Sequence, residues 1–329
     1  VLYKNMKIYK TKSYWIDKKN KGYFKSGKIS SINSGELIVK TLFSGISYGT
    51  EKLVHSGKVP NSQKNLMKCP YQEGDFGNDI KYGYINVGKV VDGDKSYLGS
   101  NIFSLYPHQD FYKIPYNEVL IIPDKIPLTR CLLIPNLETA INAVWDTLPS
   151  AGDRILVIGA GIVGLLTAYL INKIPGVNLF IVDKDSSKSK IAKKLGIKFL
   201  DTIPKKFSAR FIYECTGDHR VLNSIRNNIT VNSTICVLSW YGDKKSEIAL
   251  GENFFSKRAK LIMSQVSKIS PTRFDLTNQD RRKIALDILE ASNDLDYLVE
   301  KKYVNFDHLD EFFSNKKNHN NFLCKVVKY

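Results

Sequence analysis

The sequence predicts a two-domain α/β protein in which a β-rich module is followed by a doubly wound parallel sheet. The chain of 329 residues is longer than a usual single domain. Up to about Asp124, short β-type segments are separated by Gly, Pro, Asn and Asp. From Asp153 onward, continuous apolar runs alternate with helical segments, as expected for parallel strands buried on both faces. We therefore expect domains at residues 1–124 and 125–265, with residues 266–329 returning to the first domain.

The first module is predicted to contain five strands, Glu36–Phe43, Tyr84–Val91, Asn101–Tyr106, Phe111–Ile114 and Glu118–Ile122. A helical pattern follows over Leu128–Thr147. Directly after the first strand comes SGISYGTEK, Ser44–Lys52. Gly45 and Gly49 suit a turn, but a turn does not explain the four hydroxyl side chains of this stretch. It is either a surface turn or an active-site loop.

The second domain is predicted to contain five buried strands, Arg154–Ile158, Asn178–Val182, Ala209–Glu214, Thr234–Ser239 and Lys260–Ser264. Three helices lie between them, over Gly161–Lys173, Ser186–Leu195 and Asp218–Asn228. Beyond Ser264 we expect a polar loop, a helix near Arg281–Ala291 and a terminal strand over Phe322–Lys328 that could return to the first module.

Composition excludes several classes of protein. No apolar run reaches the roughly 18 to 20 residues of a membrane span, and Val1–Asn20 lacks an apolar signal core, so we expect a cytoplasmic protein. The five cysteines form no CxxC pair, which argues against a metal knuckle or a disulfide framework and favours reduced, mostly buried thiols. The net charge of +17 comes from lysines spread along the chain, without a basic-aromatic stripe, so solvated lysine faces are favoured over nucleic-acid binding.

A glycine-rich turn begins the second domain. Gly159, Gly161 and Gly164 fit GxGxxG between the strand ending at Ile158 and a helix beginning at Ile162-Val163. In this context the first glycine makes the tight turn, the second lets a pyrophosphate approach the backbone, and the third allows close helix–strand packing. The amides at the helix N-terminus would then bind the phosphates. The alternative is a glycine turn in a fold that has lost its ligand.

Asp183 ends the next strand, where a carboxylate accepts hydrogen bonds from an adenosine ribose. It would repel a 2′-phosphate, so NAD(H) is favoured over NADP(H), although Lys184 and Lys188 pull the other way. A helix-capping role for Asp183 stays open. Two later strand ends are candidates for the nicotinamide end of the cofactor, Thr216-Gly217 and Ser239-Trp240.

The order of a β-rich module, SGISYGTE, the stretch KYGYINVGK at Lys81–Lys89, a nucleotide-type domain and a returning C-terminal segment resembles the medium-chain dehydrogenase/reductase superfamily. The resemblance covers essentially the whole chain. It implies a GroES-like catalytic domain at residues 1–124, an NAD(P)-binding Rossmann domain at 125–265 and a homodimer formed through sheet edges. Within the superfamily, Ser44–Pro60 (SGISYGTEKLVHSGKVP) is most similar to the hydroxyethyl-bacteriochlorophyllide dehydrogenase branch.

The residues that bind zinc in metal-dependent relatives are replaced in this chain. Ser47 stands where those relatives carry a Cys, Tyr84 where they carry a His, and Pro135 near the position of a Glu or Cys. A hydroxyl, a phenol and a proline do not supply the ligands of a tetrahedral zinc site. The four-cysteine lobe of many relatives is absent as well. We therefore expect an enzyme without zinc.

Without zinc, the substrate oxygen needs hydrogen-bond donors or a general acid. Ser47, Tyr48 and Tyr84 are candidate donors, although a tyrosine in a vacated metal site can also be a packing residue. His108, in the stretch YPHQ, suits proton exchange or a structural hydrogen bond. Glu138 falls with Thr139 on a helix that in relatives lies beside the nicotinamide, and it either positions substrate or Lys52, or forms an interdomain salt bridge.

The leading hypothesis is a zinc-independent NAD(P)(H)-dependent oxidoreductase that transfers hydride between nicotinamide and a small-molecule secondary alcohol or ketone. A second hypothesis is the reduction of an activated carbon–carbon double bond, as in quinone-reductase relatives. A third, of a different class, is a non-catalytic nucleotide-sensing or RNA-binding protein on the same fold. The sequence does not identify the substrate.

Overall fold

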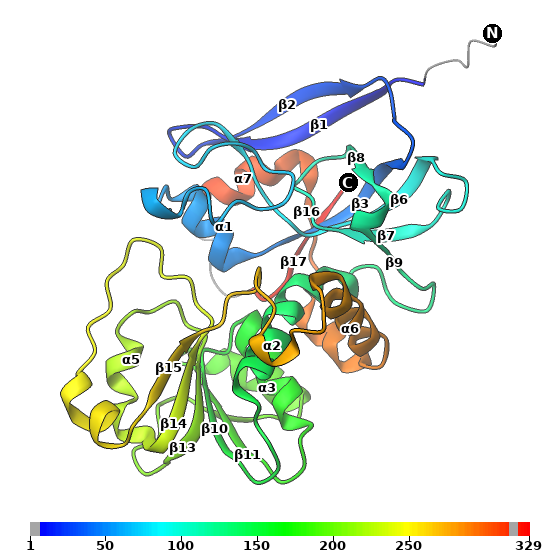
Figure 1. The fold of residues 1–329 in the computed structure, drawn as a ribbon. Helices are drawn as coiled ribbons and strands as arrows, with labels where there is room; N and C mark the ends of the chain where they lie inside the picture. The colour runs from blue at the N-terminus through cyan, green and yellow to red at the C-terminus, as the bar shows by residue number, and fades with distance from the viewer. Residues whose placement is uncertain (1–6, 316–321) are drawn as a thin grey trace. The chain divides into compact units, whose positions relative to one another are not determined.

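The computed structural model describes residues 7–315 and 322–329 and divides into two compact units (Figure 1). The first unit comprises residues 1–134 and 299–329, and the second comprises residues 135–298. These limits depart from the boundaries at 124 and 265 predicted from sequence. Segment 266–298 stays with the second unit because Arg281 donates to Asn142 Oδ1 (2.7 Å) on a helix of that unit.

A seven-stranded sheet forms the centre of the first unit, in the order β16-β17-β3-β6-β7-β9 with β8 paired to β3. Its long strand β3 (Glu36–Ile46) pairs antiparallel with β6 (Asn86–Gly93) and with the C-terminal strand β17 (Lys325–Lys328). Apolar side chains that alternate along β3 are buried with those of β6 and β7, as the period of two requires. The other strands are β7 (Asn101–Ser104), β8 (Phe111–Pro115), β9 (Val119–Ile121) and β16 (Val304–Asn305).

A second, smaller sheet of the first unit contains a hairpin that sequence reasoning missed. Strand β1 (Tyr9–Ile16) pairs along its whole length with β2 (Gly22–Ile29), and the sheet continues through β5 (Ile80–Lys81) to β4 (Glu73–Gly74). The lysines of the hairpin obscure its alternation of apolar residues. Lys25 places its ammonium 4.5 Å from the centre of the Trp15 ring, so a cation–π contact joins the basic and aromatic residues.

The second unit contains a six-stranded, all-parallel sheet in the order β12-β11-β10-β13-β14-β15. This confirms the predicted doubly wound α/β fold. Three strands match their predicted limits, β10 (Arg154–Ile158), β11 (Asn178–Val182) and β13 (Ala209–Glu214). The remaining strands are β12 (Lys198–Leu200), β14 (Ile229–Val237) and β15 (Lys260–Met263).

Most of the predicted helices are shorter than their sequence patterns suggest, but α6 (Asn278–Glu290) is longer and begins three residues before Arg281. Helix α2 (Ile134–Thr147) begins six residues later than predicted, after a 3₁₀ turn at Arg130–Leu133 and with Pro135 in its first turn, where proline is tolerated. The predicted helix over Asp218–Asn228 is reduced to α5 (Val221–Ser224) and a 3₁₀ turn. The others are α1 (Tyr48–His55), α3 (Ile162–Asn172), α4 (Ser189–Lys194) and α7 (Leu309–Ser314). Within the described ranges, none has the length and apolarity to cross a membrane.

Candidate active-site groups in the two units

The stretch Ser44–Lys52 is neither a turn nor a loop. Strand β3 continues through Ile46, Ser47 is the N-cap residue, and α1 begins at Tyr48. The turn interpretation of its glycines is wrong, because neither has a positive φ. A Cβ at Gly45 would lie 2.9 Å from the Ile85 side chain, so this glycine allows two strands to pack closely. A Cβ at Gly49 would meet nothing within 4 Å.

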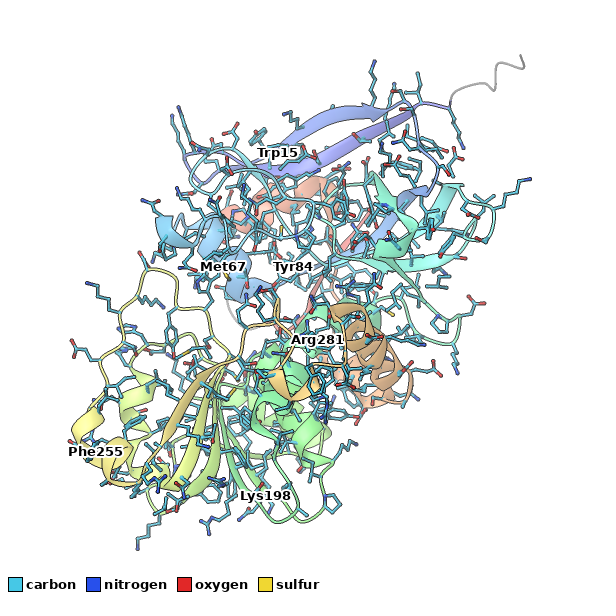
Figure 2. All side chains as sticks on the ribbon, in the orientation of Figure 1. Trp15, Met67, Tyr84, Lys198, Phe255 and Arg281 are labelled. Atoms are coloured by element: carbon cyan, nitrogen blue, oxygen red, sulfur yellow. The ribbon has the colours of Figure 1, made fainter. Side chains whose placement is uncertain are left out.

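Two of the predicted oxygen donors lie together. The hydroxyl of Tyr84, which is labelled in Figure 2, donates to Ser47 Oγ at 2.5 Å, and Thr50 Oγ1 lies 3.4 Å away from the same phenol. Ser47 is buried and Tyr84 is half-buried. Burial raises the pKa of Tyr84 to about 12, so the phenol keeps its proton at neutral pH. Two of the three positions that the resemblance matches to zinc ligands are thus joined by a hydrogen bond between hydroxyl groups.

A buried chain of hydrogen bonds continues from Ser47. Glu51 Oε1 accepts the Ser47 amide at 2.8 Å, and Glu51 Oε2 lies 3.1 Å from His108 Nε2. The other ring nitrogen, Nδ1, lies 2.7 Å from Ser44 Oγ, which is 3.1 Å from the Tyr329 hydroxyl. If Glu51 is ionised, it selects the tautomer with hydrogen on Nε2, and Nδ1 then accepts from Ser44. Both nitrogens of His108 are occupied, and the side chain is 1% exposed.

Sequence reasoning missed Glu51, Ser44 and Tyr329 as members of this chain. The one local signal is the spacing of four residues between Ser47 and Glu51, which lets the glutamate reach back to the N-cap amide. The contact between Glu51 and His108 joins residues 57 positions apart and has no such signal.

Gly83 connects Tyr84 to the same histidine. Its φ is +121°, and a Cβ there would lie 2.9 Å from His108 Cδ2. Only glycine fits this backbone angle and this close approach. His108 therefore contacts the backbone next to Tyr84 and, through Glu51, the backbone of Ser47.

Tyr48 lies in a different environment from the other two donors. Its ring packs edge-on against Phe322 with 5.1 Å between centroids, and the Lys52 ammonium lies 5.1 Å from its centre. These are the contacts of a packing residue on α1.

Glu138, on α2 in the second unit, faces two arginines of α6. Its carboxylate lies 3.5 Å from Arg281 Nε and 3.4 Å from Arg282 Nε. Burial raises the pKa of Glu138, and the arginines oppose that shift. Of the two predicted roles, the structure contains the salt bridge, formed within one unit (Figure 2, where Arg281 is labelled). Thr139, next to it, donates to the Pro135 carbonyl at 3.1 Å.

The glycine turn suits a dinucleotide. Gly159 has a φ of +101°, and a Cβ there would lie 2.7 Å from the Cys215 carbonyl oxygen. A Cβ at Gly164 would lie 1.8 Å from the Gly159 carbonyl oxygen, so this glycine is needed for packing. A Cβ at Gly161, the N-cap of α3, would meet nothing within 4 Å. Packing therefore does not explain Gly161, whereas access of a ligand to the amides of Ile162 and Val163 does.

Asp183 lies beside this turn. Its Oδ2 accepts the Ala160 amide at 2.7 Å and its Oδ1 accepts the Asp185 amide at 2.9 Å, so it joins the turn to the end of β11. The side chain stays partly exposed, and Lys184 is exposed next to it. These bonds give Asp183 a structural role in addition to the predicted role of ribose acceptor.

The neighbouring strand ends also meet at the carboxyl edge of the sheet. Ser239 Oγ accepts the Gly217 amide at 2.9 Å, and Trp240 follows it, half-buried. Glu214, fully buried at the end of β13, was missed: it accepts the Thr216 amide at 2.6 Å and the Tyr241 hydroxyl at 2.8 Å. The available signal in the sequence was a glutamate at the end of a strand predicted to be buried, because a buried carboxylate needs hydrogen-bond partners.

The residues at the expected metal position do not fit zinc. Ser47 and Tyr84 present neutral hydroxyl groups that bond to each other, and a proline side chain has no donor atom. In the part of the chain that the structure describes, no three His, Cys, Asp or Glu side chains are grouped so that they could hold a metal ion.

Comparisons with known proteins agree with this fold. No family model matches the chain. An uncharacterized zinc-type alcohol dehydrogenase-like protein of Haemophilus influenzae is 24% identical over 228 residues, which cover 66% of this chain and 63% of that relative's own length. The chain therefore spans somewhat less than two thirds of the length of this relative.

Solved structures match almost the whole chain. L-idonate 5-dehydrogenase of Escherichia coli has a TM-score of 0.79 at 14% identity and covers 98% of this chain and 99% of its own. A putative zinc-binding dehydrogenase of Sinorhizobium meliloti bound to NADP has a TM-score of 0.77 at 14% identity, covering 98% and 100%. An Escherichia coli alcohol dehydrogenase complexed with NADH has a TM-score of 0.75 at 15% identity, covering 97% and 99%. The TM-scores establish the fold, and at these low identities the structures show nothing beyond it.

Proposed function

We propose that the chain is a zinc-independent, NAD(P)(H)-dependent oxidoreductase of the medium-chain dehydrogenase/reductase superfamily, acting on a secondary alcohol or its ketone; its similarity to a zinc-type alcohol dehydrogenase-like protein and to dehydrogenase structures supports this. The observation that carries the proposal is the Tyr84–Ser47 hydrogen bond, because it joins hydroxyl groups at two of the three positions matched to zinc ligands. The redox cofactor, when bound, supplies the hydride chemistry.

The cofactor would be held by the second unit. The turn at Gly159–Gly164 and the first amides of α3 suit its diphosphate, and Asp183 suits the adenosine ribose. We favour NAD(H) over NADP(H) because the carboxylate of Asp183 would repel a 2′-phosphate, although the positive charge of Lys184 nearby would attract one. The ends of β13 and β14 supply Thr216, Gly217, Ser239 and Trp240 on the same edge of the sheet, and Thr139 belongs to the proposed nicotinamide side.

Two hydroxyl groups take over the stabilisation of the substrate oxygen. Tyr84 donates a hydrogen bond to Ser47 Oγ, so Tyr84 acts through Ser47, whose own hydroxyl hydrogen can point toward a substrate oxygen. A hydroxyl that already accepts a bond is a better donor, because hydrogen bonds in a chain polarise one another. Such pre-oriented donors stabilise negative charge as it develops on a carbonyl oxygen.

His108 acts as a positioning residue in this proposal. It has no ring nitrogen left for a substrate, but Glu51 and Gly83 connect it to both donors. Glu138 is likewise assigned no contact with substrate; it holds α2 to α6 through Arg281 and Arg282. Tyr48 is assigned a packing role.

Cofactor and metal are tested together on the purified protein. We expect NADH to quench or shift protein fluorescence with at least tenfold tighter binding than NADPH, and elemental analysis to find zinc well below one equivalent. A Gly161→Ala variant, in which the added Cβ meets no protein atom, should lose cofactor binding while keeping its unfolding temperature. Stoichiometric, tightly held zinc would contradict the proposal, as would failure of both nucleotides to bind.

Turnover assays then test the reaction class. Secondary alcohols with NAD⁺, and ketones with NADH, should give a ketone or an alcohol as product. A saturated carbonyl product from an enone would instead favour reduction of a carbon–carbon double bond.

A further inference from the structure

A basic cavity lies at the amino edge of the parallel sheet, where the proposed function uses no residue. It has a volume of about 490 Å³ and is lined by Asp153, Arg154, Lys206, Ser208, Arg210 and Thr230. Arg154 begins β10, whose other end leads into Gly159, so the cavity and the glycine turn are separated by roughly 16 Å of strand. Lys198, labelled in Figure 2, begins β12 at the same edge.

Arg154 and Arg210 are neighbours on adjacent strands. Strands β10 and β13 pair in parallel with Ile155 opposite Phe211, and the two arginines each precede these residues by one position. Two like charges placed side by side on a sheet are unfavourable, and Lys206 adds a third positive group to the same cavity. All three side chains are exposed, so solvent reduces this repulsion, but the pairing itself does not favour placing the charges together.

Each guanidinium is held in place without a carboxylate. Arg154 stacks on Phe207 at 4.6 Å and donates from Nε to the Ser208 carbonyl at 2.8 Å. Arg210 lies 5.3 Å from the Phe211 ring and donates from Nη1 to the Asn232 carbonyl. Neither arginine forms a salt bridge with any residue that the structure describes. Asp153, which also lines the cavity, accepts the Ser150 amide at 2.7 Å.

Aromatic rings and carbonyl groups thus fix the two guanidinium groups while leaving their charge uncompensated. The remaining N–H groups of both forks are available to a ligand. Planar arginine forks match the oxygen geometry of phosphate, and fixing them beforehand reduces the entropy lost on binding.

We propose that this cavity binds a phosphate-bearing small molecule, with Arg154 and Arg210 as paired ligands and Lys206 as an added charge. A phosphate dianion suits three cationic side chains better than a single carboxylate does. The cavity volume falls within the range of small-molecule sites. This site is independent of the dinucleotide turn and of the proposed hydride transfer.

The test uses pyrophosphate and inorganic phosphate as probes, titrated calorimetrically into the full chain in phosphate-free buffer of low ionic strength. We expect Arg154→Gln/Arg210→Gln to weaken pyrophosphate binding about tenfold or more. Gly161→Ala, which alters the other phosphate-binding candidate, should leave this binding unchanged. NADH binding should be unchanged in the arginine variant, so failure of one site is distinguishable from failure of the other.

Two further variants keep the test decisive if the double glutamine variant is unstable. Lys206→Gln removes an exposed charge, and Arg154→Lys/Arg210→Lys keeps the charge but removes the forks. Both should weaken pyrophosphate binding several-fold while the unfolding temperature is retained. Unchanged binding in all arginine and lysine variants would overturn the proposal, and so would loss of binding in Gly161→Ala alone. A nucleic acid that binds far more tightly than pyrophosphate, with affinity rising with chain length, would replace it with a polyanion surface.

Discussion

Each unit buries a functionally placed glutamate, and the two are stabilised in different ways. Glu51 belongs to a chain in which every carboxylate oxygen, ring nitrogen and hydroxyl has a partner. Glu138 faces two guanidinium groups at 3.5 and 3.4 Å, while its Oε1 and Arg281 Nε lack a hydrogen bond within the described residues. A hydrogen-bonded chain fixes directions, whereas an ion cluster mainly fixes proximity.

This difference suggests different tasks. The Glu51 chain sets the orientation of hydroxyl groups, which is what a reaction at a substrate oxygen requires. The Glu138 cluster holds α2 to α6, because Arg281 also donates to Asn142 Oδ1 and to the Val266 carbonyl. Removal of Glu51 should therefore mainly disturb the orientation of the hydroxyl groups, whereas removal of Glu138 should mainly lower the stability of the fold.

The largest loss of stability is expected for Glu138→Gln. This change leaves the buried Arg281 and the half-buried Arg282 without their counter-charge, and breaking a buried pair in this way costs about 3–5 kcal/mol of unfolding free energy. Urea denaturation measures it. Asp146→Asn, on the same helix, serves as the control and should cost far less. A loss below about 1 kcal/mol would show that solvent already screens the cluster.

Removal of a proposed oxygen donor should reduce turnover more than stability. Tyr84→Phe and Ser47→Ala are each expected to lower kcat by about 10²- to 10³-fold, as loss of a pre-oriented donor does elsewhere. Thr50→Val, 3.4 Å from the same phenol, is the matched control and should have a small effect. Equal losses in all three variants would point to general disruption of α1.

Glu51→Gln tests the positioning chain. Glutamine has one oxygen that accepts hydrogen bonds, and its NH₂ group only donates. It cannot accept from both the Ser47 amide and His108, so we expect a loss of about 1–3 kcal/mol in unfolding free energy. A lower kcat with little change in the KM of the cofactor should accompany it. A double-mutant cycle with His108→Gln should show coupling between the two residues. Additive effects would contradict a shared chain.

The smallest expected effect is the alkaline titration of Tyr84. Its folded pKa of about 12 lies above the ordinary value of 10.0, so the protonated phenol contributes stability that is fully present below pH 10. That contribution is lost as the pH rises through 12. The stability difference between the wild type and Tyr84→Phe should narrow over this range. Ultraviolet absorbance of tyrosinate measures the titration directly.

Predictions from sequence were most accurate for the second unit. The limits of β10, β11 and β13 followed from continuous apolar runs, and Gly159, Gly161 and Gly164 followed from a local motif with a strand on one side and a helix on the other. The hairpin β1–β2 was missed because lysines occupy its exposed positions and stack on aromatic rings. SGISYGTEK was misread as a loop, since Gly45 reports a close packing of strands that no local pattern reveals.

The residue types around the candidate site were readable before folding: hydroxyl groups where metal-dependent relatives have ligands, and a histidine in YPHQ. Their connections were not. Ser44 and Glu51 share one stretch of sequence, but Glu51 and His108 are 57 positions apart and Ser44 and His108 are 64 apart, so their contacts form only in the folded chain. Local patterns report backbone propensity and burial, which depend on neighbours in sequence. Which buried oxygen faces which nitrogen depends on strand register and on the close approach that glycines allow. Only the folded structure therefore shows that both ring nitrogens of His108 have hydrogen-bond partners.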